Sequence, residues 1–333
     1  MARMTPLRSH SISGRECPWR RLLAVFALAT LLAGTLGSAG CARGTTPART
    51  TSTKPLPGAA APVFPVTVTD DASRTVTIES RPERIVSLAP ANTEMLAALG
   101  LEDRLVGVTT FDDYPPSVKD LPKMGDFVAP NLEAIGSARP DLVVSTTGVQ
   151  ADVLKKLEDV GAVVIAIDPQ TLEGLYADIE MLGRATGAGS QAADVVVSMR
   201  TNIEEISSMV SREPVVTAFV EIGQNPLFTV GSGTLIDEML TAAGGKNVVS
   251  QAGYVAYSLE QLMTDNPQVY FATMGTMSDP SDLAKRPGYD KLGAVKAGRV
   301  FSLEDDLVTR PGPRIVDGIR DMAQALHPAV APH

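Results

Sequence analysis

The stretch that decides the fold runs from residue 84 to residue 146: RIVSLAPANTEMLAALGLEDRLVGVTTFDDYPPSVKDLPKMGDFVAPNLEAIGSARPDLVVST. A short β-rich run at residues 85–88 breaks at Pro90, and a helix begins at Asn92 or Thr93. A second β-rich run and a Pro-Pro loop follow. This order places the ends of two strands and their loops at one edge, where parallel α/β sheets hold ligands.

The same pattern continues outward from this stretch. An alternating segment at residues 66–78 predicts a leading β-hairpin. Strands that alternate with helices predict a mainly parallel sheet covered by helices. Within a first lobe at residues 66–171, we expect strands at 84–88, 105–108, 142–145 and 163–167 and helices at 92–99, 132–137 and 149–160.

Residues 172–212 contain no strand signal and predict two linking helices separated by a Gly-Ala-Gly turn. The second helix repeats apolar side chains at helical spacing, at Val195, Met199, Ile203, Ile206 and Val210. This helix either lies on the surface of one domain or joins two lobes. Because a new β-α pattern starts just after it, we expect a long rigid helix between two lobes, and about 22 residues would span about 33 Å.

The second lobe is expected at residues 213–328. Its sequence again mixes short apolar runs with helical periods, and its last helix follows two prolines. The expected elements are strands at 215–221, 228–230, 248–249, 269–272 and 300–303 and helices at 235–243, 259–264, 289–295 and 314–326. The predicted fold is therefore α/β, with two lobes whose loops face each other across a ligand cleft.

The first forty residues predict a secretory signal peptide. Two arginines precede an apolar run at residues 22–36, which is shorter than the roughly 20 residues of a membrane-spanning helix. Small residues then lead to Cys41, which we interpret as the lipid-bearing first residue of a lipoprotein. An incidental thiol or plain signal cleavage stays open, because Ser38 stands where lipoprotein signals carry Leu or a similar residue. Residues 41–65 are rich in Thr, Pro, Ala and Gly and predict a flexible tether.

Composition excludes several functions. The chain has 29 Lys and Arg against 38 Asp and Glu; without the five basic and one acidic residue of the first forty, 24 against 37 remain, a net charge of about −13. This charge disfavours nucleic acid and anionic lipid as partners. The only histidines and cysteines are His10, His327, His333, Cys17 and Cys41. Residues 42–326 contain no histidine and no cysteine. They therefore lack the residues of a Zn site, of a Ser-His-Asp or Cys-His catalytic centre, and of a haem site with a His or Cys ligand. We expect a protein that is not an enzyme and that holds no metal and no cofactor.

Aromatic side chains are few, at 5% of the chain, yet six of them fall in polar segments that contain Gly or Pro. They are Phe111, Tyr114, Phe127, Phe228, Tyr254 and Tyr257. Burying an aromatic ring normally stabilises a protein more than exposing it does. Each ring alone could pack its own loop, but together the six predict a pocket with apolar walls.

Four short motifs carry a resemblance to a known family. They are Ala89-Pro90-Ala91-Asn92-Thr93-Glu94, Asp113-Tyr114-Pro115-Pro116, Asn131-Leu132-Glu133-Ala134-Ile135 and Arg139-Pro140-Asp141-Leu142-Val143. With them, residues 66–327 resemble the helical-backbone substrate-binding proteins of ABC importers, and most of all the cobalamin-binding members. That family delivers cobalamin, ferric siderophores and haem to a membrane permease. The resemblance implies an extracytoplasmic protein with two lobes joined by a long helix.

The resemblance also implies a corrinoid ligand and the residues that bind it. These are Phe111, Tyr114, Phe127, Phe228 and Tyr254, together with Asp306 and Arg310, which lie where relatives close the cleft with an acid and a base. Aromatic rings suit the flat face of a corrin, and polar groups suit its amide rim. Phe127 and Tyr254 replace tryptophans of the cobalamin-binding members but keep the aromatic platform. Without a binding role, Asp306 and Arg310 would be a solvated pair worth well under about 1 kcal/mol.

Glu133 and Glu260 each stand at the start of a short predicted helix, one in each lobe. An acidic first turn complements the helix dipole, which alone would explain both residues. The resemblance implies instead that the two glutamates meet arginines of the permease. Carboxylates on separate lobes, each able to accept a bidentate arginine, would dock the protein in register.

Other functions fit the sequence less well. A glycosidase-like enzyme would place two acids across a cleft, but no motif of nucleophile, phosphate loop or metal ligands accompanies the acids here. A purely structural lipoprotein leaves the loop aromatics unexplained. A ferric siderophore, or haem, is the alternative ligand. Because an anionic siderophore complex calls for several arginines and the loops supply chiefly Arg310 and Arg314, we expect a neutral corrinoid delivered to an ABC permease by a membrane-anchored protein.

Overall fold

The structure is a computed structural model that describes residues 63–159, 161–275 and 280–330. The predicted signal peptide at residues 1–40, Cys41 and the predicted tether up to residue 62 lie outside these ranges. Among the helices of the described ranges, none is long and apolar enough to cross a membrane.

The first lobe is built on a four-stranded parallel sheet. Its elements are β3 (Ile85–Ser87), α1 (Pro90–Ala98), η1 (Glu102–Arg104), β4 (Leu105–Gly107), η2 (Pro116–Val118), α2 (Leu132–Ala138), β5 (Leu142–Ser145), η3 (Gly148–Gln150), α3 (Ala151–Asp159) and β6 (Val163–Ala166). The strand order is β4-β3-β5-β6, and β3 and β5 are buried at every position because helices cover both faces. The predicted parallel alternation is confirmed. Helix α1 begins two residues before the expected start, since Pro90 is tolerated in a first turn.

An antiparallel hairpin precedes this sheet, as predicted. Its strands are β1 (Val66–Thr69) and β2 (Thr75–Ile78). The carboxylate of Asp70 accepts hydrogen bonds from the backbone N–H of Arg74 at 2.9 Å and from that of Ala166 at 3.1 Å. Asp70 therefore holds the bend of the hairpin against the end of β6.

The second lobe contains a six-stranded mixed sheet. Its elements are β7 (Val216–Gln224), β8 (Leu227–Val230), α6 (Leu235–Ala242), β9 (Gly245–Asn247), β10 (Tyr254–Ala256), α7 (Leu259–Asp265), β11 (Val269–Met274), η4 (Pro280–Lys285), η5 (Tyr289–Lys291), α8 (Gly293–Lys296), β12 (Val300–Glu304), α9 (Asp305–Thr309) and α10 (Ile315–Leu326). The order is β10-β8-β7-β11-β12, with β9 beside β7. The pairs that join β7, β9, β11 and β12 are parallel, and those of β8 and β10 are antiparallel.

Parts of this lobe differ from the sequence-based expectation. The strand predicted at residues 248–249 is wrong, because residues 245–247 pair with β7 and Val249 is a buried core residue beyond the strand. The helix predicted at residues 289–295 is divided at Leu292 into η5 and α8. Strand β10 and helix α9 have no predicted counterpart, since three and five residues are too few to show a period.

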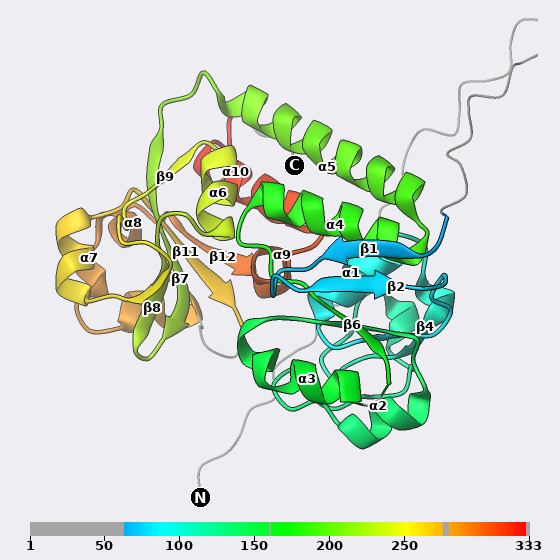
Figure 1. Cartoon of the computed structure of the whole chain (residues 1–333). Coiled ribbons are helices and arrows are strands. Elements are labelled where there is room, and N and C mark those ends of the chain that lie inside the picture. The colour runs from blue at the N-terminus through cyan, green and yellow to red at the C-terminus, as the bar shows by residue number, and fades with distance from the viewer. Residues whose placement is uncertain (1–62, 160, 276–279, 331–333) are drawn as a thin grey trace, which may run out of the picture. The chain divides into compact units, whose positions relative to one another are not determined.

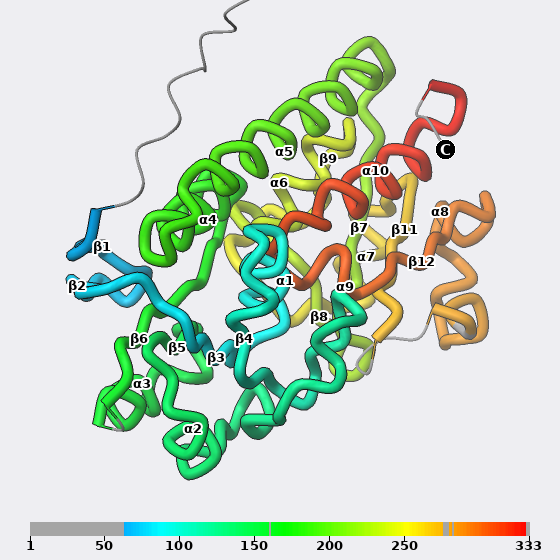
Figure 2. Tube along the Cα trace, turned by 90° about the vertical axis from the view of Figure 1, so that its right-hand side faces the viewer, coloured from blue at the N-terminus to red at the C-terminus, as the bar shows by residue number. Residues whose placement is uncertain are grey.

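Two consecutive helices, α4 (Leu172–Thr186) and α5 (Gly189–Val210), lead from the first lobe to the second. Gly187 ends α4 in the left-handed region at φ 75°, which costs a glycine little. The 22-residue α5 packs on α4 and also on α6 and α10 of the second lobe, and Figures 1 and 2 show it running along both lobes. Its buried face includes Val196, and the predicted Val195 is half-buried against the same core.

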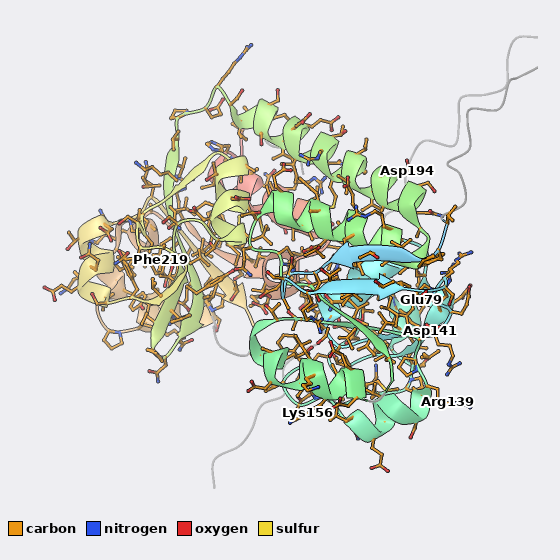
Figure 3. All side chains as sticks on the ribbon, in the orientation of Figure 1. Glu79, Arg139, Asp141, Lys156, Asp194 and Phe219 are labelled. Atoms are coloured by element: carbon orange, nitrogen blue, oxygen red, sulfur yellow. The ribbon has the colours of Figure 1, made fainter. Side chains whose placement is uncertain are left out.

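Aromatic rings form the core of the second lobe around Phe219, which Figure 3 labels among the strands of its sheet. The centroid of its ring lies 5.2 Å from that of Tyr270 and 5.5 Å from that of Tyr257. The hydroxyl of Tyr257 donates a hydrogen bond to Asp265. Tyr257 is therefore a packing residue of this core and not a wall of the predicted pocket.

Candidate functional site

A cleft with a volume of about 710 Å³ is lined by both lobes. The first lobe contributes the segments that follow β3, β4, β5 and β6, and the second contributes β10, α9 and the first residue of α6. Because parallel strands end at the same edge of a sheet, these distant loops gather at one place. The aromatic and charged residues of the lining are Phe111, Phe127, Asp168, Tyr254, Asp305, Asp306 and Arg310.

Three of the predicted aromatic residues meet in this cleft. Phe111 and Phe127 come from the first lobe and Tyr254 from the second. Phe111 is 57% exposed and Tyr254 is 46% exposed, although rings of this size are usually buried. The arrangement leaves aromatic surface on both lobes free to cover a flat, partly apolar ligand.

Phe228 and Tyr114, also predicted to bind the ligand, lie outside this lining. Phe228 is a half-buried residue of β8, paired with Ala256 of β10. The ring of Tyr114 lies under the guanidinium of Arg314, with 4.0 Å between the Arg314 Cζ and the ring centroid. Such a stacked cation stabilises the position of both side chains.

A short loop after β4 sets the position of Phe111 in the cleft. The buried carboxylate of Asp112 accepts hydrogen bonds from both the backbone N–H, at 3.0 Å, and the hydroxyl of Thr109. Burial raises the pKa of Asp112 although these hydrogen bonds favour its charged form. The closed loop presents Phe111 on one side of Asp112 and Asp113 on the other.

An ion cluster that includes two cleft-lining residues joins the two lobes. Glu94 of α1 is only 3% exposed, and it accepts two hydrogen bonds from the guanidinium of Arg314 at 2.6 and 2.8 Å. Arg310 lies 3.3 Å from Glu94, 2.7 Å from Asp113 and 2.8 Å from Asp306. A buried carboxylate needs such cationic partners, because an unpaired charge is expensive to bury.

The pKa values show that Arg310 is strongly held in its charged form. Burial acts to lower the pKa of Arg310, but Asp113, Asp306 and Glu94 outweigh it and the pKa rises. The hydrogen bonds from Arg314 to Glu94 raise the pKa of Arg314. Burial raises the pKa of Asp306 in spite of Arg310, whereas Arg310 outweighs burial at Asp113 and lowers its pKa. The positive charge of Arg310 in the cleft is therefore shared among three carboxylates.

This geometry changes the role expected for Asp306 and Arg310. They do form a pair, but Arg310 also bonds to two acids of the first lobe, so the pair is not an isolated solvated one. Glu94 stands within the motif at residues 89–94, but its sequence context gives no sign of this role. Its partners Arg310 and Arg314 lie 216 and 220 residues away, and no local pattern signals such a contact.

Three carboxylates meet beside the cleft where the hairpin, the end of β6 and α4 come together. Asp178 of α4 is 4% exposed, and burial, the charge and hydrogen bond of Asp71, and the charge of Asp168 raise its pKa to about 8. This raised pKa favours the protonated form of Asp178 at neutral pH. In the described part of the chain, no group of three His, Cys, Asp or Glu residues is arranged to hold a metal ion.

Glu133 and Glu260 are exposed and stand in the first turns of α2 and α7. Each helix is capped by the preceding polar residue: Asn131 accepts a hydrogen bond from the N–H of Ala134 at 3.0 Å, and Ser258 from that of Gln261 at 3.1 Å. Because other side chains cap the helices, both glutamates are free to face solvent. Their role in docking stays a prediction.

The chain matches the model of the periplasmic binding protein family over residues 85–307. It is 38% identical over 275 residues to YvrC, an uncharacterized ABC transporter substrate-binding lipoprotein of Bacillus subtilis, with 80% of this chain and 87% of that protein covered. It is 31% identical over 245 residues to a vitamin B12-binding protein of Vibrio campbellii, with 73% and 88% covered. A periplasmic heme binding protein of Pseudomonas aeruginosa has a similar structure, with a TM-score of 0.68, 28% identity, and 76% and 95% covered.

These relatives are binding proteins and not enzymes, in agreement with the expectation from the sequence. The fold, the cleft lined by both lobes and the match over most of the chain lead to one conclusion. The chain belongs to the periplasmic binding protein family and is the substrate-binding protein of an ABC transporter.

Proposed function

We propose that this protein captures a cobalamin or a related corrinoid and delivers it to an ABC importer. The observation that carries the proposal is the set of cleft-lining rings on both walls, the exposed Phe111 and Tyr254 and the half-buried Phe127. Aromatic faces from two lobes can enclose a broad flat ring system. Similarity to a vitamin B12-binding protein supports the same ligand class.

The charge of the cleft supports a corrinoid over an anionic ligand. A catecholate siderophore complex or the carboxylates of haem would call for cations that are free to pair with them. Of the cleft-lining residues, all of which are described, Arg310 is the one cation, and three carboxylates already surround it. A ligand with neutral amides around its rim needs no such cation.

A ferric siderophore or haem is the second candidate. Similarity to the heme binding protein of Pseudomonas aeruginosa favours it, because that protein shares the fold at 28% identity. The described residues contain a single histidine, His327, which is buried and hydrogen-bonded to the backbone of Gly244 in the second lobe. Haem would therefore have to bind in the cleft without a histidine ligand.

Delivery requires contact with the membrane and with the permease. We propose that Cys41 carries a lipid and that residues 42–65 act as a tether, which the lipoprotein name of the Bacillus subtilis relative supports. We further propose that Glu133 and Glu260 pair with arginines of the permease. Their exposure on separate lobes supports this role, since each carboxylate is accessible to a bidentate arginine.

Isothermal titration calorimetry tests the proposed ligand. The full chain in mild detergent is titrated with cobinamide, cyanocobalamin, a ferric catecholate siderophore, a ferric hydroxamate siderophore and haem. We expect each of the two corrinoids to bind one-to-one. We expect no heat of binding with either siderophore or with haem. Binding of a siderophore or haem alone would contradict the corrinoid assignment and leave the family assignment intact.

A further inference from the structure

We propose that the cleft selects the positively charged forms of its corrinoid, and that Asp168 and Asp305 determine this preference. The proposal rests on the corrinoid function proposed above and adds the sign of charge that the site favours. Neither residue stands in a motif that predicts a role.

The charged residues of the lining leave the cleft negative. They are Asp168, Asp305, Asp306 and Arg310. Arg310 is not available to offset the other two acids, because it is shared among Asp306, Asp113 and Glu94. In a cleft with protein walls, such an excess of one sign raises the local concentration of ligands of the opposite sign.

Asp168 presents a full negative charge from the first lobe. Its carboxylate accepts hydrogen bonds from the side chain of Gln170 at 3.0 Å and from the hydroxyl of Thr147, both neutral donors. Within the described residues it forms no ion pair. Its charge also reaches the opposite wall, because it adds to the effect of burial in raising the pKa of Tyr254.

Asp305 supplies the matching charge from the second lobe. It is the first residue of α9 and lies against Gly275, at the end of β11, where a Cβ would stand 3.1 Å from the Asp305 carboxyl carbon. Across the described ranges, its carboxylate has no cationic partner within ion-pair distance. Asp168 and Asp305 thus present uncompensated charge from the two lobes.

The aromatic walls favour the same sign of charge. The face of an aromatic ring is electrostatically negative and attracts cations, more strongly when the pair is shielded from water. Phe111, Phe127 and Tyr254 offer such rings in the same cleft. Rings and carboxylates are independent features, and both disfavour an anion.

Two forms of one corrinoid test the proposal. Diaquacobinamide and dicyanocobinamide share the same ring and amides and differ in the axial ligands, so the first is positively charged and the second is neutral. We expect the full chain to bind the diaqua form about tenfold more tightly in low salt. The difference should shrink towards onefold in about 1 M salt, where the screening length is about 3 Å.

Variants identify the residues that cause the difference. We expect Asp168→Asn and Asp305→Asn each to weaken binding of the diaqua form by about three- to tenfold and to leave the dicyano form nearly unchanged. Asp290→Asn removes the same charge from an exposed residue of η5 outside the cleft and should alter neither affinity. Melting temperatures identify any variant that fails to fold. If one of the two variants fails to fold, the other still tests the proposal.

The outcomes separate this inference from the function on which it rests. Equal affinity for the two forms, or tighter binding of the neutral form, overturns the charge preference while corrinoid binding stands. A preference that persists in high salt, with a shifted corrinoid absorption spectrum, indicates coordination to the cobalt and also overturns it. Binding of neither form overturns the corrinoid function itself, and the inference with it.

Discussion

The first lobe contacts the cleft through loops, whereas the second contacts it through a short strand and a short helix. Phe111, Phe127 and Asp168 follow or connect strands of a parallel sheet. Tyr254 stands on β10 and the charged residues on or next to α9. The cleft residues of the first lobe can therefore be predicted from the sequence, because they follow the ends of strands. Those of the second lobe lie on short elements that form only when the chain packs.

Buried carboxylates have different partners in different parts of the molecule. In the second lobe, Glu221 is fully buried and bonds to Arg286 at 2.7 Å and to the hydroxyl of Tyr270. On the side of the first lobe, buried Asp70 pairs with Arg74 at 2.6 Å, whereas burial and two neighbouring carboxylates raise the pKa of Asp178. Between the lobes, acids of the first pair with arginines of the second. Buried carboxylates in both lobes and between them are thus paired with arginines, while Asp178 lies beside other acids and favours its protonated form.

Charge reversal on both lobes at once should give the largest effect. We expect the double variant Glu133→Arg with Glu260→Arg to abolish uptake while ligand affinity stays nearly unchanged, because like charges at a docking surface cost several kcal/mol. Growth on limiting corrinoid reports uptake, and calorimetry reports affinity. Glu180→Arg with Glu205→Arg reverses two exposed charges on the linking helices and should support normal growth.

Normal growth of the Glu133 and Glu260 variant would show that these glutamates only begin their helices. Loss of ligand binding in the same variant would place them in the cleft instead. Single reversals then show whether both lobes contribute equally to docking.

Removal of the charge that joins the lobes should give the next largest effect. Glu94→Gln removes the carboxylate that pairs with Arg314 and one of the three that pair with Arg310, and we expect the free energy of unfolding to fall by about 3 kcal/mol. Glu173→Gln is the matched control, because Glu173 also accepts two hydrogen bonds from one arginine, Arg200, but does so on the surface. The control should lose well under about 1 kcal/mol. Urea denaturation measures both, and equal losses would argue against a stabilising inter-lobe cluster.

The aromatic walls give a smaller effect on ligand affinity. We expect Phe127→Ala and Tyr254→Ala, one from each lobe, to weaken corrinoid binding by about 1 to 3 kcal/mol. Phe228→Ala distinguishes the resemblance from the cleft geometry, since the resemblance implies an equal loss and the position of Phe228 outside the lining implies a smaller one. Wild-type affinity in the first two variants would show that these rings only pack their loops.

The raised pKa of Asp178 predicts that stability depends on pH. Its pKa of about 8 exceeds the usual 3.8, so the folded chain keeps a proton that the unfolded chain releases above pH 3.8. Its stabilising contribution is full below that value and is lost as the pH rises to about 8, at up to about 1.4 kcal/mol for each pH unit. Asp178→Asn should remove this loss and stabilise the protein at pH 8. Asp194→Asn, an exposed change on α5 labelled in Figure 3, should not. Parallel pH profiles of wild type and Asp178→Asn would contradict the assignment.

The sequence predicts the first lobe well because its strands are buried, regular and separated by clear breaks at proline and glycine. It predicts Tyr254 as a wall residue without predicting the strand that carries it. It misplaces Tyr257, since nothing local distinguishes a ring that packs on Phe219 from one that faces a cleft. It gives no sign that Glu94 pairs with Arg314, because contacts across 220 residues arise only from tertiary folding.

The central claim, that the cleft holds a corrinoid, is tested most directly by identifying the molecule bound to the protein in its source. The full chain, purified from native membranes without added ligand, is analysed by native mass spectrometry and then denatured to release small molecules. We predict one corrinoid per chain, lost in a variant that combines Phe127→Ala with Tyr254→Ala. A co-purified iron chelate or haem in place of a corrinoid would contradict the claim.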